Sequence, residues 1–163
     1  MARVDSRLDT ILLAIVTRLI AEVSGADAAS CFLAIDDEQV TGNADGFILV
    51  VSPQGGNFDD GALDGGGQNQ ATDYFTFSVT IYSTTMLDPG GQDSAALTDA
   101  TLGLVAKHRD VLQALTVHDL LSGSDNILRD VPMPTTYDFG KSGRGLCYVR
   151  QSFKLSFDWN LTA

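Results

Sequence analysis

The stretch that decides the fold is residues 74–82, which read YFTFSVTIY. From position 75 to position 81 the odd-numbered residues are apolar, and the residues between them are Thr76, Ser78 and Thr80. Because successive side chains of a β-strand point to opposite faces, this alternation predicts a strand with one apolar and one hydroxylated face. Such a strand needs neighbours in a sheet and a second layer that covers its apolar face.

The same alternation returns over residues 146–159. Between Cys147 and Trp159 the odd-numbered residues are apolar except for Gln151, and the even-numbered ones after Tyr148 are polar. We expect one long strand here, although strands usually have about five or six residues. A strand of this length either bends between two layers or reaches past its own sheet. The polar Gln151 interrupts the apolar face and predicts a β-bulge or a bend near this position.

The remaining apolar segments add helices and further strands. Leu8 to Val23 has apolar residues at three- and four-residue steps, which is typical of an amphipathic helix. A second helix is expected from a cap at Asp93 or Ser94 to residues 107–109, whose positive charges suit the end of a helix dipole. Short strands are expected at 31–35 and 46–51, and a further helical turn at 110–115.

The order of these elements predicts one α+β domain over residues 1–163. We expect two layers, with an antiparallel (mixed) sheet of about four strands and two helices packed on one face. Residues 52–72 are rich in glycine and acidic residues and predict a long loop, which can serve as an arm that orders against a neighbouring molecule. Residues 116–144 predict an irregular connection, because Pro132 and Pro134 exclude a helix there.

The charge of the chain is strongly negative and unevenly distributed. Ten Lys and Arg residues face 21 Asp and Glu residues, which gives a formal net charge of -11. No basic residue occurs between Arg18 and Lys107, whereas from Lys107 onward seven basic residues face six acidic ones. This pattern excludes nucleic-acid binding by phosphate neutralisation, which needs clustered basic side chains. An acidic surface repels DNA, which suits a channel through which DNA slides. Solubility alone is the alternative explanation.

The sequence indicates neither secretion nor a membrane span. An apolar run follows Arg3 and Arg7, but Arg18 and other charged residues interrupt it at helical spacing, so an amphipathic helix fits better than a signal peptide. No segment reaches the roughly 18 to 20 apolar residues that a membrane helix needs. Cys31 and Cys147 stand in apolar, strand-like contexts, and we expect both to be buried, reduced thiols of a cytosolic protein.

Motifs for enzymatic chemistry are weak in this sequence. Gly140-Lys141-Ser142 lacks the upstream glycine of a phosphate-binding loop, and it precedes a predicted strand rather than a helix. His108 and His118 belong to no recognisable nucleophile or metal motif. We therefore expect no catalytic, cofactor-binding or metal-binding residues, no cofactor and no enzymatic activity.

Taken in order, the elements resemble the tail-terminator family of long-tailed bacteriophages, the type called minor tail protein U. The resemblance implies a structural virion protein, made in the host cytoplasm, that forms a hexameric ring at the head-proximal end of the tail. Such a ring ends polymerisation of the tail tube and joins the tail to the neck or connector. Its partners are copies of itself, the tail-tube protein and neck or connector proteins, while DNA passes without specific binding. The matching features are the opening amphipathic helix, the strand at 73–82, the helix capped at Asp93-Ser94, the segment Thr136-Tyr137-Asp138-Phe139 in a polar connection, and the final strand at 148–161.

The resemblance and the charge pattern together indicate which residues meet between subunits. We expect the acidic middle of one copy to meet the mildly basic C-terminal third of the next copy. Edge pairing by the long final strand, or by the acidic loop, is a further way to reach a neighbour. The alternative interpretation is that each candidate residue belongs to an ordinary solvated surface. The candidate interface residues are Asp59, Asp60, Asp64, Thr76, Ser78, Thr80, Arg150 and Lys154.

Two other functions stay open from the sequence. One is another virion protein of similar build, such as a neck, head-completion or baseplate protein. The other is a small α+β module that binds a metal ion or another small ligand. Asn57, Asp59, Asp60 and Asp64 lie among glycines as in calcium-binding loops, although the closing glutamate of an EF-hand is missing.

Overall fold

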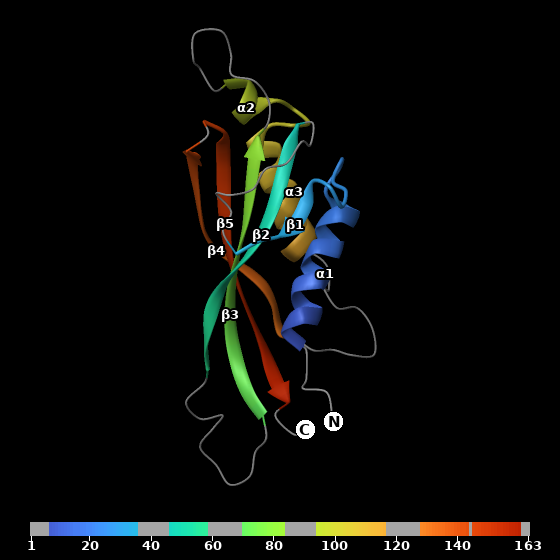
Figure 1. Cartoon of the computed structure of the whole chain (residues 1–163), viewed down its shortest axis with the longest axis vertical. Helices are drawn as coiled ribbons and strands as arrows, with labels where there is room; N and C mark the ends of the chain where they lie inside the picture. Colours follow the sequence, from blue (N-terminus) through green and yellow to red (C-terminus); the bar gives the residue numbers. More distant parts are fainter. Residues whose placement is uncertain are drawn as a thin grey trace.

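The computed structural model describes residues 7–35, 46–58, 70–83, 94–116, 128–143 and 145–160. The described strands form one five-stranded mixed sheet in the order β1-β2-β3-β5-β4, in which the β1–β2 pair is parallel and the others are antiparallel. Figure 1 shows a strongly twisted sheet with the helices beside it. The predicted α+β class is confirmed, with one more strand and one more helix than expected. The elements are α1 (Arg7–Glu22), β1 (Cys31–Leu33), β2 (Phe47–Phe58), β3 (Gln70–Ser83), α2 (Ser94–Thr98), α3 (Leu104–Thr116), β4 (Leu128–Lys141) and β5 (Cys147–Asn160).

The main core lies between the helices and one face of the sheet. In α1, Ile11, Ile15 and Leu19 recur every four residues and are fully buried, so they form one stripe along the helix. They pack in one cluster with residues of α3 and with odd-numbered residues of β3 and β5. Gly25, just after the helix, has a φ of 82°, a conformation that glycine adopts without strain. The predicted helix over residues 8–23 is confirmed.

Strands β3 and β5 pair along almost their whole length and form the centre of the sheet. Phe77 faces Phe153 across the two strands, and the ring centroids are 5.3 Å apart. Both strands agree with the sequence prediction. Gln151 pairs with Val79 of β3 in an unbroken register, whereas the β4–β5 register shifts close to Gln151, opposite Phe153 and Ser152. The side chain of Gln151 donates a hydrogen bond to the backbone carbonyl of His108 in α3.

Strand β2 continues into the glycine-rich segment, so the loop prediction is wrong for residues 52–58 and 70–72. The β2–β3 pairing shifts register between Pro53 and Gly55, where Gly55 has a φ of 114°. Gly56 then lies so close to β3 that a Cβ atom would come within 2.9 Å of the Tyr74 carbonyl oxygen. Glycine therefore allows both the irregularity and the close strand contact. Residues 59–69 of the predicted loop lie outside the described residues.

Strand β4 occupies much of the segment that the sequence predicts to be irregular, so that prediction is wrong for residues 128–141. β4 pairs with β5 and stands at one edge of the described sheet. Proline is tolerated in an edge strand because its missing N–H can face away from the neighbouring strand. One shift of the β4–β5 register lies between Pro134 and Thr136, so the extra residue stands in β4 near the predicted irregularity at Gln151.

The helix that the sequence predicts from residue 93 to residues 107–109 is divided into α2 and α3, and α3 also contains the helical turn predicted at 110–115. The carboxylate of Asp99 accepts hydrogen bonds from the backbone N–H groups of Leu102 at 2.7 Å and Thr101 at 2.9 Å, which turns the chain between the helices. These bonds, that from Leu102 foremost, hold the pKa of Asp99 below its usual value. Residues 107–109 consequently lie in the first half of α3, and their predicted position at a helix end is wrong.

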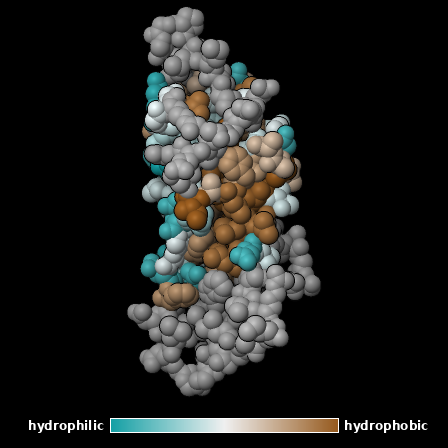
Figure 2. Space-filling model, in the orientation of Figure 1, coloured by the Kyte–Doolittle hydropathy of each residue, from teal (hydrophilic) through white to brown (hydrophobic). Residues whose placement is uncertain are grey.

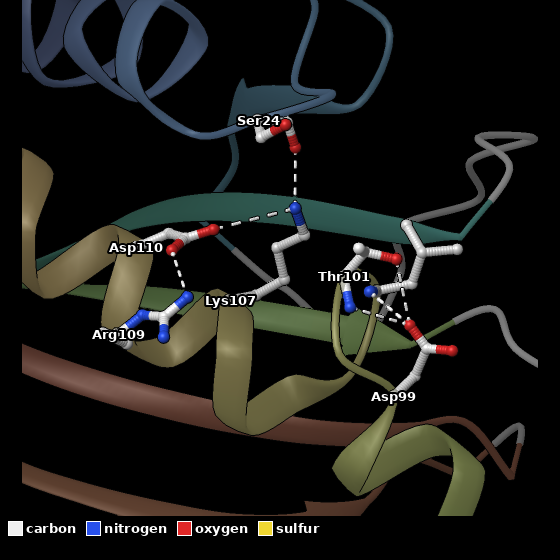
Figure 3. Close-up of polar contacts among 7 residues, drawn as sticks. Ser24, Asp99, Thr101, Lys107, Arg109 and Asp110 are labelled. Atoms are coloured by element: carbon white, nitrogen blue, oxygen red, sulfur yellow. Dashed lines mark hydrogen bonds and ion pairs between the residues drawn. The ribbon is translucent and has the colours of Figure 1, made fainter.

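Lys107 of α3 is buried and reaches the other elements of the core. Its ammonium group donates a 2.6 Å hydrogen bond to the carbonyl oxygen of Ser24, just beyond the end of α1 (Figure 3). The same nitrogen lies 4.4 Å from the centroid of the Phe47 ring in β2 and 3.8 Å from the carboxylate of Asp110. Burial lowers the pKa of Lys107, and the nearby Asp110 raises it in part. One buried cation thus connects the end of α1 with β2 and α3.

Candidate functional site

The structure brings five of the eight predicted interface residues together on one face of the sheet. Across β3 and β5, Thr76 pairs with Lys154 and Thr80 pairs with Arg150, with Ser78 between the two threonines. These side chains point away from the main core, because the odd-numbered residues of both strands fill it. The other three candidates, Asp59, Asp60 and Asp64, lie outside the described residues.

Two of these five residues are not accessible to a partner. Ser78 and Thr80 are buried, whereas Thr76 and Arg150 are half-buried and Lys154 is exposed. Arg150 donates a 3.4 Å hydrogen bond from Nε to the Thr80 hydroxyl. The interface prediction for Ser78 and Thr80 is therefore wrong as an exposed contact, since these hydroxyls belong to contacts within the chain.

The two cations of this polar row, Arg150 and Lys154, each lie over an aromatic ring. The Arg150 guanidinium lies 5.2 Å from the centroid of the Tyr148 ring, and the Lys154 ammonium lies 5.5 Å from that of Tyr74. A cation within about 6 Å of a ring centroid is attracted to the negative face of the ring. Both cations are therefore held over β3 and β5, close to the edge strand β4.

The edge strand β4 is the most exposed element of the described sheet. Every residue from Met133 to Phe139 is exposed, including three large apolar or aromatic ones. The exposed fractions are 59% for Met133, 61% for Tyr137 and 45% for Phe139. The sequence analysis missed this surface because it treated 116–144 as irregular. The available signal was the alternation of Tyr137 and Phe139 with Thr136 and Asp138.

An aromatic cluster lies between this edge and α3. The His108 ring centroid is 4.8 Å from that of Tyr137 and 6.5 Å from that of Phe139, and the two aromatic rings meet edge to face. The side-chain amide of Gln151 contacts Nδ1 of His108 and donates a 2.9 Å hydrogen bond to its backbone carbonyl. Burial lowers the pKa of His108. Gln151 thus interrupts the apolar face of β5 in order to bind the helix above it.

Two shallow recesses open along the same side of the molecule. One has a volume of about 230 Å³ and is lined by residues of α3, β4 and β5, including His108, Leu112, Tyr137 and Gln151. The other, of about 220 Å³, is lined by residues that include Phe139 and Lys141. Within the described part of the chain, the buried Oε1 of Gln151 has no hydrogen-bond partner. The first recess therefore has aromatic walls and a polar group at its base.

The segment 140–142 does not form a phosphate-binding loop. It comprises the end of β4 and the start of the turn to β5, where the Ser142 N–H donates a 2.8 Å hydrogen bond to the carbonyl of Leu146. A phosphate-binding loop needs a following helix whose N-terminus faces the phosphate. This geometry agrees with the sequence interpretation.

The titratable groups of the described residues offer little chemistry. Among them no three His, Cys, Asp or Glu side chains are grouped as a metal site. Cys31 and Cys147 are buried thiols that form no disulfide, and burial raises the pKa of the Cys31 thiol to about 12, far from the range of a reactive thiolate. Asn57 is exposed near the end of β2, and His118 and the three loop aspartates lie outside the described residues.

A second set of exposed apolar side chains lies on α1, at the end of β1 and just beyond β1, which is the other outer strand of the sheet. Its exposed fractions are 59% for Leu13, 37% for Leu33 and 88% for Ile35, and the half-buried Leu12 and Val16 adjoin Leu13 on the helix. Figure 2 shows an extended apolar area on the side of the molecule where α1 and β1 lie. These exposed side chains were not predicted, because Leu13 stands outside the apolar stripe of the helix and the short apolar run at 31–35 does not show which of its residues are covered.

No protein-family model matches the chain, and a search of curated proteins finds no significant match. In the part of the chain that the structure describes, no helix combines the length and the apolar character needed to cross a membrane.

Proposed function

We propose that this protein is a structural subunit that assembles with copies of itself into a ring, and that the ring is the tail terminator of a tailed bacteriophage. In this role the ring sits at the head-proximal end of the tail, ends polymerisation of the tail tube and joins the tail to the neck or connector. The observation that carries the proposal is the exposed edge strand β4, with Met133, Tyr137 and Phe139 open to solvent.

An exposed edge strand with large apolar side chains is unfavourable for a protein that works alone. Its outer row of backbone groups is a template for pairing with another chain, and solitary proteins usually blunt such an edge with charges, prolines or a covering helix. Here Pro132 and Pro134 protect one half of β4, whereas the half from Thr135 to Phe139 carries one charged residue, Asp138. A partner that covers this half removes apolar surface from water and completes the edge.

The overall charge supports the position in a DNA-conducting particle. At a net charge of -11, the chain repels a passing polyanion. Two basic residues of the sheet, Arg150 and Lys154, are held over aromatic rings of the chain itself. A ring of such subunits lets DNA slide and holds its neighbours by protein contacts.

Tube assembly in the presence of the purified protein tests this proposal. Tail-tube protein is polymerised with and without the chain, and tube length and tube ends are imaged by electron microscopy. We expect shorter tubes that carry a ring at one end. Tubes of unchanged length without such a ring would refute the terminator role. A particle imaged with this protein at the baseplate or at the head would assign it to another virion position.

A matched pair of variants connects the assay to β4. Tyr137→Glu places a charge on the exposed edge, whereas Gln113→Glu adds the same charge on an exposed position of α3. We expect the first variant to lose ring formation and tube capping and the second to keep both. Equal behaviour of the two variants would separate the activity from the β4 surface.

A further inference from the structure

We infer that the subunits of the ring meet head to tail, with the β4 edge of one copy docked on the α1–β1 surface of the next copy. The β4 edge is defined by residues 133–139, and the α1–β1 surface by Leu13, Leu33 and Ile35. The inference rests on the proposed function in one respect, namely that the chain assembles with itself. It goes further by naming the two surfaces that meet.

The two surfaces lie on opposite sides of the subunit. β1 and β4 are the two outer strands in the sheet order β1-β2-β3-β5-β4. Figure 1 shows α1 and β1 on one side of the molecule and the later part of β4, which leads to β5, on the other, whereas the first part of β4 crosses to the side of α1. Each side exposes three large apolar or aromatic side chains, with exposed fractions between 37% and 88%. A contact between two different surfaces at opposite sides leaves one of each free in every pair, so further copies add until a ring closes.

Pairing of like surfaces does not account for the same observations. If two copies joined through their β4 edges, the twofold contact would be complete in a dimer. Both α1–β1 surfaces, with Ile35 at 88% exposure, would then stay in water. The head-to-tail arrangement covers both apolar surfaces of every copy, and it is favoured because apolar burial drives association.

Charge favours the same arrangement. Near β4, the described cations are Lys141, Arg150 and Lys154, and Asp138 and Asp158 offset part of their charge. The side with α1 and β1 exposes Asp9, Glu22 and Asp27, and Arg18 offsets part of that charge through its 3.5 Å ion pair with Glu22. A mildly basic side therefore meets an acidic one in the head-to-tail contact, whereas two β4 sides would repel each other.

The recess beside Tyr137 supplies an anchor point for the contact. It has a volume of about 230 Å³, lies between α3 and β4, and is lined by His108, Leu112 and Tyr137 among others. The most exposed large apolar side chain among the described residues is Ile35, beside β1. We assign Ile35 of the next copy to this recess, because interface energy concentrates where a protruding side chain fills a pocket.

Complementation between two blocked variants tests the inference. Tyr137→Glu blocks the β4 edge, and Leu13→Glu blocks the α1–β1 surface; each should weaken self-association by about 30-fold or more. Sedimentation velocity over a range of concentrations measures the association, and circular dichroism verifies the fold of each variant. We expect rings from the wild type and monomers from either variant alone. An equimolar mixture should form one-to-one dimers and nothing larger, because it contains one intact surface of each kind.

Every other outcome of this experiment contradicts the inference. Dimers of Leu13→Glu alone, with no gain on mixing, would show a twofold β4 contact. A wild type that stays monomeric at every concentration would show that the two surfaces do not meet. The exposed variant Gln113→Glu serves as the control and should associate as the wild type does. If mixing gives dimers while tail tubes are unaffected, the tail role fails and the head-to-tail contact stands.

Ile35 has its own variant, which separates the anchor from the rest of the surface. Ile35→Ser leaves the fold unaltered because the side chain makes little contact within its own chain, at 88% exposure. We expect it to weaken self-association by about tenfold. Wild-type association in this variant would place another side chain in the recess.

Discussion

Replacing Lys107 by methionine removes a buried cation and keeps most of the side-chain volume. The ammonium group has a hydrogen bond to Ser24 at 2.6 Å and lies 4.4 Å from the Phe47 ring centroid. Burial nevertheless lowers the pKa of Lys107, so these contacts do not fully repay the loss of hydration. Methionine avoids that loss, and the exposed Ser24 can hydrogen-bond to water instead. We expect Lys107→Met to be as stable as the wild type or more stable by about 1 kcal/mol.

Lys107→Ala separates the aliphatic stem from the ammonium group. The stem is buried between α3, β2 and the end of α1, so its removal should leave a cavity and cost about 2–4 kcal/mol of unfolding free energy. Urea denaturation followed by circular dichroism measures both variants. Lys154→Met, at an exposed position, is the control and should stay within about 0.5 kcal/mol of the wild type. A loss of about 2 kcal/mol or more in Lys107→Met would refute the conclusion that burial outweighs the contacts of the ammonium group.

The pH dependence of the same variants gives an independent check. The pKa of Lys107 in the folded protein lies below its ordinary value of 10.5. As the pH rises from the lowered pKa to 10.5, the folded protein has released this proton while the unfolded chain still holds it. The free energy of unfolding of the wild type therefore rises over this window. Lys107→Met has no such proton, so the difference by which its unfolding free energy exceeds that of the wild type should shrink over this pH window. A difference that grows with pH would show that the pKa of Lys107 is not lowered.

Three further predictions concern the core and the aromatic cluster. Burial lowers the pKa of His108 below its ordinary value of 6.5. As the pH falls below 6.5, the unfolded chain gains a proton that the folded protein does not, so the free energy of unfolding should fall. The urea midpoints at pH 7 and pH 5 should therefore differ less in His108→Gln than in the wild type. Phe77→Ala should cost about 3–5 kcal/mol because its ring is fully buried against Phe153, whereas the exposed Phe58→Ala should cost about 0.5 kcal/mol or less, measured by the same denaturation. Burial raises the pKa of Cys31 to about 12 from an ordinary 9.0, so the thiol ionises first in the unfolded chain. The free energy of unfolding should therefore decline as the pH rises above 9.0, and it should decline less in Cys31→Ala. Equal declines in the two proteins would show that Cys31 does not cause this pH dependence.

The parts of the fold that could be predicted are those in which one periodicity covers a whole element. Residues 8–23 repeat with the period of a helix, and residues 74–82 and 147–159 alternate with the period of a strand. In each of these segments one face is apolar and the other is polar, so the pattern predicts which face packs against the other layer. The prediction of two-layer α+β architecture follows from these three segments.

The elements that could not be predicted lack that contrast between two faces. In β4, residues 133–139 are exposed on both faces and include a proline, and the alternation of Tyr137 and Phe139 with polar residues is too short to mark the whole strand. In β2, Gly55 and Gly56 resemble a loop, yet β3 supplies the pairing that holds them extended. The division between α2 and α3 depends on hydrogen bonds to the carboxylate of Asp99, which a helical period does not reveal.

The candidate site was predicted in part for the same reason. Alternation predicts that Thr76, Ser78 and Thr80 share one face of their strand and that Arg150 and Lys154 share one face of theirs. That the two strands are neighbours, so that the two rows meet, is seen only in the structure. Burial of Ser78 and Thr80 depends on what covers that face, which alternation alone does not specify. The two apolar surfaces at the edges follow from the order of strands in the sheet, and that order is a property of tertiary pairing.

The order of strands also determines how the chain must acquire its structure during synthesis. β5 lies between β3 and β4 in the sheet, although it follows both of them in the sequence. A ribosome therefore delivers β4 before the strand that connects it to β3 exists. Until residues 147–160 emerge, any direct pairing of β3 with β4 is a misfolded state that must dissociate. Sheet formation is consequently a late event, dominated by long-range contacts and slow by nature, and it depends on the strand that is made last.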